Sequence, residues 1–136
     1  MVDELQAYCI PRAQIDEAWP GVAKLIEEAY KSSDENVPPD TLAQLRMGHR
    51  QLWVVWDGRQ VLAAALTRII VLRSCLACQV TACGGHDGDR WINLISRIEE
   101  WAKAEGCGKV QVEGRLGWER KLPKYTRARI VLELEL

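Results

Sequence analysis

The stretch from Gln79 to Cys107 constrains the fold most, because an apolar segment, a glycine-rich turn and a long amphipathic segment follow one another there. In the amphipathic part, apolar residues recur every three or four positions: Trp91, Leu94, Ile95, Ile98, Trp101 and Ala102. This spacing predicts a helix with one apolar stripe facing a core. Asp87 or Asp89 is expected to cap its first turn, since a short carboxylate accepts hydrogen bonds from free amides. Gly106 and Gly108 suit the left-handed turn that ends a helix.

The glycine turn before this helix carries the main functional signal in the sequence. Unpaired N–H groups and the helix dipole favour an anion, such as a phosphate, at a helix N-terminus. His86 lies in this turn and could contact a phosphate or relay a proton. A solvated loop histidine is the alternative interpretation.

Composition narrows the class of protein. The chain has 136 residues, enough for one domain with a core, and 48% of them are apolar. A net charge of −1 argues against nucleic acid as a partner. No apolar run is long enough to span a bilayer, and the acidic start lacks a hydrophobic signal core. These features predict a cytoplasmic protein.

Five cysteines, an odd number, fit a reducing compartment. Cys75 and Cys78 have the spacing of a zinc or redox pair, but residues three apart on a strand point to opposite faces. No second pair of metal ligands follows at a suitable distance, so small buried hydrophobes are the favoured interpretation. The sequence also contains no Ser-His-Asp order and no Walker-type phosphate loop.

The N-terminal part predicts a strand from about Leu5 to Ile10, followed by two helices. Proline fits the first turn of a helix, so the first firm helix is expected to begin at Pro20. The polar segment 32–39 ends in Pro-Pro and predicts a loop. Asp40 is expected to cap the second helix, and Gly48 to close it.

The central part predicts three meandering strands. Asp57-Gly58 lies between two apolar runs and indicates a tight hairpin, because such a turn needs positive φ. A third strand is expected from Cys75 to Ala82. After the long helix, Lys109–Glu113 is expected to form a strand and 116–122 a short helical turn.

The last residues alternate in polarity. Ile130, Leu132, Leu134 and Leu136 alternate with Val131, Glu133 and Glu135, which predicts a half-buried final strand. The element order is then β-α-α-β-β-β-α-β-α-β in one domain over residues 1–136. That order predicts an α/β (α+β) protein with a mixed, mostly antiparallel sheet and helices on both faces.

This order is similar to that of the GNAT acyl-CoA N-acetyltransferase superfamily. Two segments carry the resemblance in sequence. Ile98–Cys107 looks like the end of the family's third helix, and Gly117–Leu122 resembles its Phe-Tyr-Glu-Lys-Leu segment. Val112–Leu122 also resembles small GNAT-like proteins encoded by tailed phages and prophages.

The resemblance implies an acetyl-CoA site between the strand ending at Cys83 and the strand Lys109–Glu113. The implied cofactor-binding residues are Ala82, Cys83, Gly84, Gly85, His86, Asp87, Gly88, Asp89 and Arg90. An ungapped alignment with the family's pyrophosphate loop puts His86 at the loop's Gln or Arg position. It puts Asp89 and Trp91 at positions that the family fills with small residues. A carboxylate repels a pyrophosphate, so Asp89 predicts weakened acetyl-CoA binding. With a gap in the alignment, Gly84, Gly85 and Gly88 would form the cradle instead.

The resemblance also suggests catalytic residues. Glu113 ends a strand beside the implied cleft and could act as a general base, with a routine surface carboxylate as the alternative. The family's tyrosine falls on Glu119, so Tyr125 is the nearest candidate for the general acid, unless it packs against the tail. A strand amide near Ala82 or Cys83 would polarise the acetyl carbonyl.

Two functions follow from the resemblance. The first is transfer of an acetyl group from acetyl-CoA to an amine of a small molecule or a protein. The second is a catalytically silent GNAT-fold module that binds phage structural proteins in a virion. A basic segment near the C-terminus could hold CoA phosphate, nucleic acid or an acidic partner, or could be a solvated edge. It comprises Arg115, Arg120, Lys121, Lys124, Arg127 and Arg129.

Overall fold

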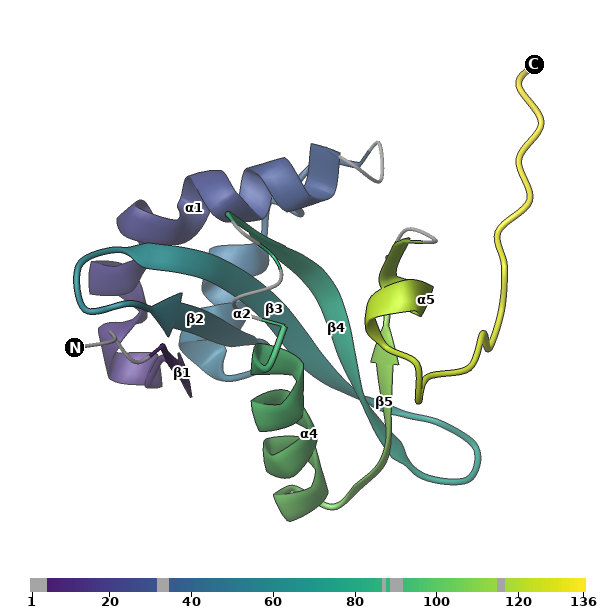
Figure 1. Cartoon of the computed structure of the whole chain (residues 1–136). Coiled ribbons are helices and arrows are strands. Elements are labelled where there is room, and N and C mark those ends of the chain that lie inside the picture. The colour runs from purple at the N-terminus through teal and green to yellow at the C-terminus, as the bar shows by residue number, and fades with distance from the viewer. Residues whose placement is uncertain (1–4, 32–34, 87, 89–91, 115–116) are drawn as a thin grey trace.

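The computed structural model describes the chain except for residues 1–4, 32–34, 87, 89–91 and 115–116. Its centre is a five-stranded sheet in the order β1-β2-β3-β4-β5 (Figure 1). The strands are β1 (Gln6–Cys9), β2 (Gln51–Trp56), β3 (Val61–Val71), β4 (Leu76–Gly85) and β5 (Cys107–Val112). The first four strands pair antiparallel, and β5 pairs parallel to β4. The predicted fold class is confirmed.

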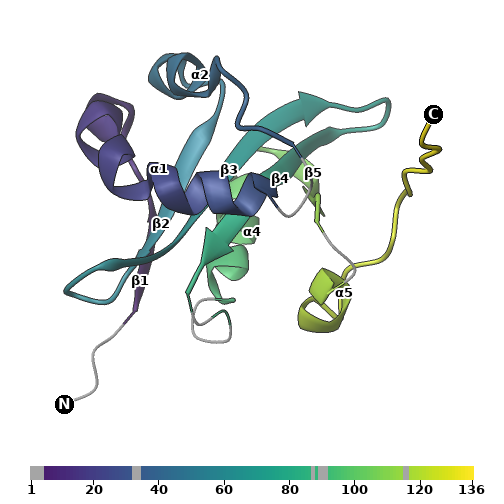
Figure 2. The ribbon, with the colours of Figure 1, turned by 90° about the horizontal axis from the view of Figure 1, so that it is seen from above.

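Helices cover both faces of the sheet (Figures 1 and 2). The helices are η1 (Arg12–Gln14), α1 (Ile15–Lys31), α2 (Thr41–Met47), α4 (Leu94–Ala104) and α5 (Gly117–Lys121). Alternation along β2 explains the two layers, because successive strand residues point to opposite faces. Leu52 and Val54 pack in the core with α1 and α2, whereas Trp53 and Val55 pack in the core with α4.

The local turn predictions are confirmed except at Gly108, which lies within β5 and not in the turn after the helix. Gly58 has φ +95° in the hairpin, and Asp57 Oδ1 accepts hydrogen bonds from the amides of Arg59 and Gln60 at 2.8 Å each. Gly48 ends α2 with φ +80°, and Gly106 follows α4 with φ +87°. Left-handed conformations of this kind favour glycine.

Two helix starts differ from their predictions. Helix α1 begins at Ile15 rather than at Pro20, which lies inside it. Pro20 lacks the N–H that would bond to the Asp16 carbonyl, but its ring is exposed and buried Ile15 anchors the first turn. Asp40 occupies the position before α2, yet its side chain accepts a hydrogen bond from Gln44 Nε2 at 2.6 Å and does not cap the helix.

The long helix and the strand after it also differ from their predictions. Helix α4 begins at Leu94, and the predicted caps Asp87 and Asp89 lie outside the described residues. Strand β5 begins at Cys107, directly after the left-handed Gly106.

The predicted final strand is wrong. Residues 126–136, here called the tail, form no strand, and Figure 1 shows the tail leading away from the sheet after α5. Its apolar residues are exposed: Ile130, Val131, Leu132, Leu134 and Leu136. Polarity alternation predicts a strand only where a pairing partner is present, and no described strand lies in register with the tail.

None of the helices in the described part of the chain combines the length and apolarity needed to cross a bilayer.

Candidate active site

The sheet opens where β4 and β5 separate. Their parallel register ends at the pair Val80 and Val112, and the amide of Glu113 donates to the Val80 carbonyl at 3.0 Å. Strand β3 stays paired with β4 as far as Gly85. Among the described strands, the last residues of β4 therefore have a neighbour on one side only (Figure 1).

A β-bulge marks the point of separation. Leu66 lies opposite Ala82, whereas Thr67 lies opposite Val80, so Thr81 is the extra residue on β4. A bulge bends a strand and increases its twist, which turns the end of β4 away from β5. The buried guanidinium of Arg50 donates from Nη1 to Thr81 Oγ1 at 3.1 Å and so supports the bulge.

Just before the bulge, a row of polar side chains ties three strands together. Arg68 Nε donates to Gln79 Oε1 at 2.9 Å, and Gln79 Nε2 donates to Gln111 Oε1 at 2.9 Å. Gln79 is buried, so these bonds satisfy groups that are costly to leave unpaired. The row fixes β3, β4 and β5 directly beneath the opening.

The pairing of β3 with β4 sets the direction of the backbone groups at the opening. The amide of His86 donates to the Leu62 carbonyl at 2.9 Å. Antiparallel partners alternate between hydrogen-bonded and non-bonded pairs, so Gly84 and Ala82 also bond to β3. The N–H and C=O groups of Cys83 then point away from β3, toward the side that β5 has left. The Cys83 amide is therefore available for a ligand at the opening, whereas the Ala82 amide bonds to β3.

The thiol of Cys83 lies on the α4 face and packs against that core. Burial raises the pKa of Cys83 to about 12, and the nearby charge of Lys121 on α5 opposes that shift. At neutral pH the side chain is a protonated thiol, which is a poor nucleophile. Cys83 therefore contributes its backbone to the opening.

Gly84 and Gly85 belong to β4 and allow close packing. A Cβ on Gly84 would approach the Leu25 carbonyl of α1 to 2.8 Å, and one on Gly85 would collide with the Leu62 carbonyl of β3. Of the other predicted phosphate contacts, His86 is exposed and Gly88 is the one described residue within 87–91. Asp87, Asp89 and Arg90, like Trp91, lie outside the described residues. The first turn of α4 carries no acidic residue, so it is compatible with an anion.

The two predicted catalytic residues occupy different positions. Glu113 lies at the separation point, and its Oε1 is 3.6 Å from Arg129 Nη2 in the tail. Tyr125 donates its hydroxyl hydrogen bond to Glu99 Oε2 of α4 at 2.6 Å. Burial and this bond raise the pKa of Tyr125, so its phenol is neutral at pH 7.

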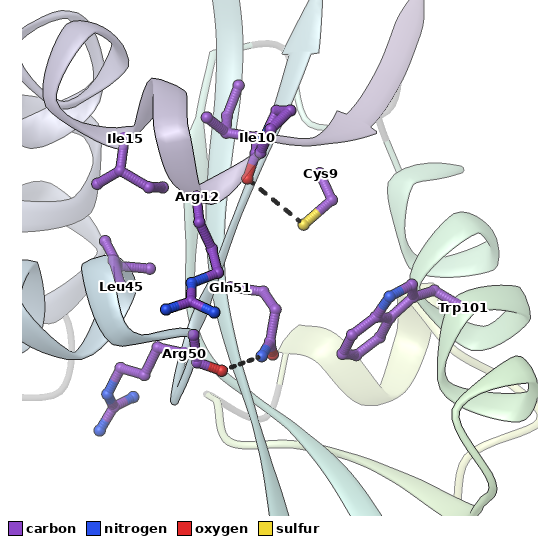
Figure 3. Close-up of a pocket in the computed structure, with 10 residues that line it drawn as sticks. Cys9, Ile10, Arg12, Ile15, Leu45, Arg50, Gln51 and Trp101 are labelled. Atoms are coloured by element: carbon purple, nitrogen blue, oxygen red, sulfur yellow. Dashed lines mark hydrogen bonds between the residues drawn. The ribbon is translucent and has the colours of Figure 1, made fainter.

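A separate, mainly apolar pocket lies between the start of α1, the end of α2 and α4 (Figure 3). Its lining is Cys9, Ile10, Pro11, Arg12, Ile15, Leu45, Gly48, Arg50, Gln51 and Trp101. Arg12 Nε donates to the Arg46 carbonyl at 3.1 Å, so its guanidinium links η1 to the end of α2. The indole of Trp101 contacts Trp53 edge-on, with ring centroids 5.6 Å apart. Arg50, which lines this pocket, contacts the bulge at Thr81. The pocket itself is not part of the opening between β4 and β5.

The described residues include no group of three or more His, Cys, Asp or Glu side chains placed to hold a metal ion.

Comparison with solved structures identifies this architecture. An aminoglycoside acetyltransferase from an uncultured soil metagenomic sample, solved with sisomicin, superposes with a TM-score of 0.72 at 11% identity. The comparison covers 97% of this chain and 96% of that one. The chain has the GNAT fold. A ribosomal-protein-alanine N-acetyltransferase from Brucella melitensis biovar Abortus 2308 is similar at a TM-score of 0.65 and 13% identity, over 98% and 99% of the chains.

A GNAT family acetyltransferase from Staphylococcus aureus is also similar, with a TM-score of 0.61 at 10% identity over 97% and 98% of the chains. No protein-family model and no curated protein sequence matches this chain. At identities this low, the likeness establishes the fold of this GNAT-fold chain. The narrower resemblance to phage-encoded proteins stays a prediction.

The resemblance implied an acetyl-CoA site between the strands that correspond to β4 and β5, and that site stays a prediction. The residues that shape the opening between these strands were not predicted. The bulge at Thr81 has no sequence signature. Arg50 is a charged residue just before an apolar strand, and such a residue is usually exposed. The burial of Arg50 is visible only in the structure. The sequence assigned Lys121 to the basic segment but did not predict that it lies near Cys83.

Proposed function

We propose that this GNAT-fold protein transfers an acetyl group from acetyl-CoA to the amine of a small molecule or a protein. The observation that carries the proposal is the released end of β4, where the Cys83 N–H points into the side vacated by β5. A preorganised amide directed at a developing negative charge is a strong catalytic device. Acetyl-CoA would supply the thioester, whose carbonyl carbon accepts the amine.

The residues present fit such a ligand. The Cys83 amide would donate to the acetyl carbonyl oxygen, and Gly84 and Gly85 keep β4 close to α1 and β3 without side chains. Lys121 lies near Cys83 and would favour the anionic groups of CoA. The predicted contacts at His86, Gly88 and Arg90 remain part of the proposal.

Glu113 is the proposed general base, because it lies where the strands separate and its carboxylate is partly exposed. It would accept a proton from the attacking amine, directly or through a water molecule. Tyr125 is the proposed general acid, which would protonate the departing thiolate. Its phenol carries the proton at neutral pH, and it would have to exchange its bond to Glu99 for one to the sulfur.

The test combines acetyl-CoA calorimetry with an assay for free CoA thiol over a panel of amines. Glu113→Gln should lower kcat by roughly 100-fold or more, as expected for removal of a general base. Arg129→Gln is the matched control, because it removes the same ion pair and leaves the Glu113 carboxylate in place. Absence of acetyl-CoA binding at millimolar concentration, or equal loss in both variants, would contradict the proposal.

A further inference from the structure

Arg50 is a buried positive charge. Of the charged side chains that the structure describes, it alone is buried, with 8% of its surface exposed. Its Nε donates to Gln44 Oε1, and its Nη1 donates to Thr81 Oγ1 at 3.1 Å, so both partners are neutral. A guanidinium keeps its charge inside a protein, and removing an ion from water is costly unless an opposite charge lies beside it. The burial of Arg50 therefore points to an anion that binds there.

The chain itself does not supply that anion. Arg46 is paired with Asp16 at 2.6 Å, but none of the described Asp or Glu side chains forms an ion pair with Arg50. Gln44 Nε2 donates to Asp40 Oδ2 at 2.6 Å, so that carboxylate contacts the amide of Gln44 and not the guanidinium. Within the described residues, the charge of Arg50 is met by neutral acceptors alone.

A second guanidinium lies on the same face of the sheet. Arg68 of β3 donates from Nε to Gln79 Oε1 of β4 at 2.9 Å, and it too has no ion pair with a described residue. Cys78 and Val80 pack in the α4 core, so Gln79 faces the side of α1 and α2. The side chain of Thr81 faces that side as well, because it meets Arg50.

The two guanidinium groups, here called the arginine pair (Arg50 and Arg68), therefore lie close together. Their partners Thr81 and Gln79 are two residues apart on β4, which is about 6.6 Å along a strand. Arg68 and Thr81 are partly exposed, so solvent reaches this part of the face. In Figure 3 the Arg50 guanidinium points away from Trp101 of α4, in keeping with its position on the other face.

The arginine pair is a neighbour of the proposed general base. Val80 of β4 pairs with Val112 of β5, and both pack in the α4 core. Glu113, the next residue on β5, therefore faces the side of α1 and α2, as Thr81 does on β4. Adjacent strands are about 4.8 Å apart. Glu113 and the Thr81 hydroxyl that Arg50 contacts are thus separated by about one strand spacing.

We propose that the acceptor of the acetyl group is a small amine that also carries a carboxylate, and that Arg50 and Arg68 bind this carboxylate. The inference rests on the proposed acetyl transfer and names its substrate class. A carboxylate accepts two parallel N–H bonds from a guanidinium and would compensate the buried charge. The amine nitrogen would bond to the acetyl carbon as the C–S bond breaks. Glu113 takes the amine proton, and the thiolate takes one from Tyr125, which gives an N-acetyl amino acid and CoA.

Matched pairs of acceptors test this substrate class. Glycine, β-alanine and γ-aminobutyrate are each compared with the corresponding amide in the assay for free CoA thiol. The acid of at least one pair should exceed its amide by roughly tenfold in kcat/KM, because charge-assisted hydrogen bonds are about twice as strong as neutral ones. Short peptides that begin with Asp or with Asn distinguish a free amino acid from the end of a peptide chain as the source of the carboxylate.

Variants assign the preference to the arginine pair. Arg68→Gln removes one cation and should bring the ratio of acid to amide toward one, mainly by raising KM for the acid. Arg73→Gln in the exposed β3–β4 turn is the matched control and should keep the ratio. Arg50→Lys keeps the charge but loses the planar fork, so it should also lower the ratio. A preference for the acid that survives Arg68→Gln and Arg50→Lys would overturn the assignment.

A binding measurement separates this inference from the proposed acetyl transfer. In ¹⁵N-labelled protein, the Nε–H signals of Arg50 and Arg68 should shift saturably with at least one of the three acids and not with its amide. If these signals shift but no amine releases CoA, the acetyl transfer fails and the carboxylate site stands. If acids and amides are acetylated equally well, the acetyl transfer stands and the carboxylate site is overturned. Signals that none of the acids moves would overturn the site in either case.

Discussion

The two halves of β4 differ in their neighbours. The first half, Leu76–Val80, lies between β3 and β5, and its buried Gln79 bonds to both neighbouring strands. The second half, 81–85, keeps β3 but has lost β5, so the backbone of Cys83 is turned toward the opening. A sheet can thus create a binding edge by releasing one strand at a bulge. The first half should govern stability and the second half ligand binding.

The largest expected effect is on stability, at the core beneath the paired half. Ile98 of α4 is fully buried in the cluster that contains Cys78 and Val80. Ile98→Ala should lower the free energy of unfolding by about 2–5 kcal/mol, because it leaves a cavity. Urea denaturation measures the loss, with exposed Ser96→Ala on the same helix as the control. If both variants lost equally little, the α4 core would be assigned incorrectly.

A smaller effect is expected where the released half meets α1. Gly84→Ala places a Cβ 2.8 Å from the Leu25 carbonyl, and backbone there must shift to accept it. Overpacking of this kind costs about 1–3 kcal/mol. Gly21→Ala in α1 is the matched control, because a Cβ there meets nothing within 4 Å and alanine favours a helix by about 1 kcal/mol. A Gly84→Ala variant as stable as Gly21→Ala would show that α1 does not pack on β4 as described.

The sequence predicted the parts of the fold that local chemistry decides. The Asp57-Gly58 hairpin and the left-handed Gly48 follow from the conformational freedom of glycine, and both are present. The start of α1 was missed because burial of Ile15, a tertiary effect, outweighs the local preference of Pro20 for a first turn. The final strand was predicted wrongly, because alternation says nothing about whether a partner strand exists.

The candidate site, too, has features that the order of elements predicts and features that only the coordinates give. The resemblance implied a site between the two strands that correspond to β4 and β5, since that depends on the order of elements. Which amide faces the opening depends on the β3–β4 register, and so the choice of Cys83 over Ala82 required coordinates. The bulge at Thr81 and its support by Arg50 join residues 31 positions apart in the chain, beyond the reach of periodicity.

The smallest effect is expected from the Cys83 side chain. Cys83→Ala keeps the backbone amide, so kcat/KM for acetyl transfer should change little. Because burial raises the pKa of the thiol from 9.0 to about 12, its contribution to stability is complete below about pH 9 and is lost as pH rises toward 12. Urea denaturation at pH 8 and pH 11 should show a smaller loss for Cys83→Ala than for the unmodified protein. Rapid modification of native Cys83 by a thiol reagent at pH 8 would contradict this.

The central claim is that the released end of β4 binds acetyl-CoA through backbone groups. A titration of the ¹⁵N-labelled protein with acetyl-CoA, followed by amide chemical shifts, tests it at single residues. The account predicts saturable shifts of the Cys83 and Gly85 amides, with the Gln79 amide in the paired half little changed. An unmoved Cys83 amide at saturating acetyl-CoA, or shifts confined to the pocket around Cys9 and Gln51, would contradict it.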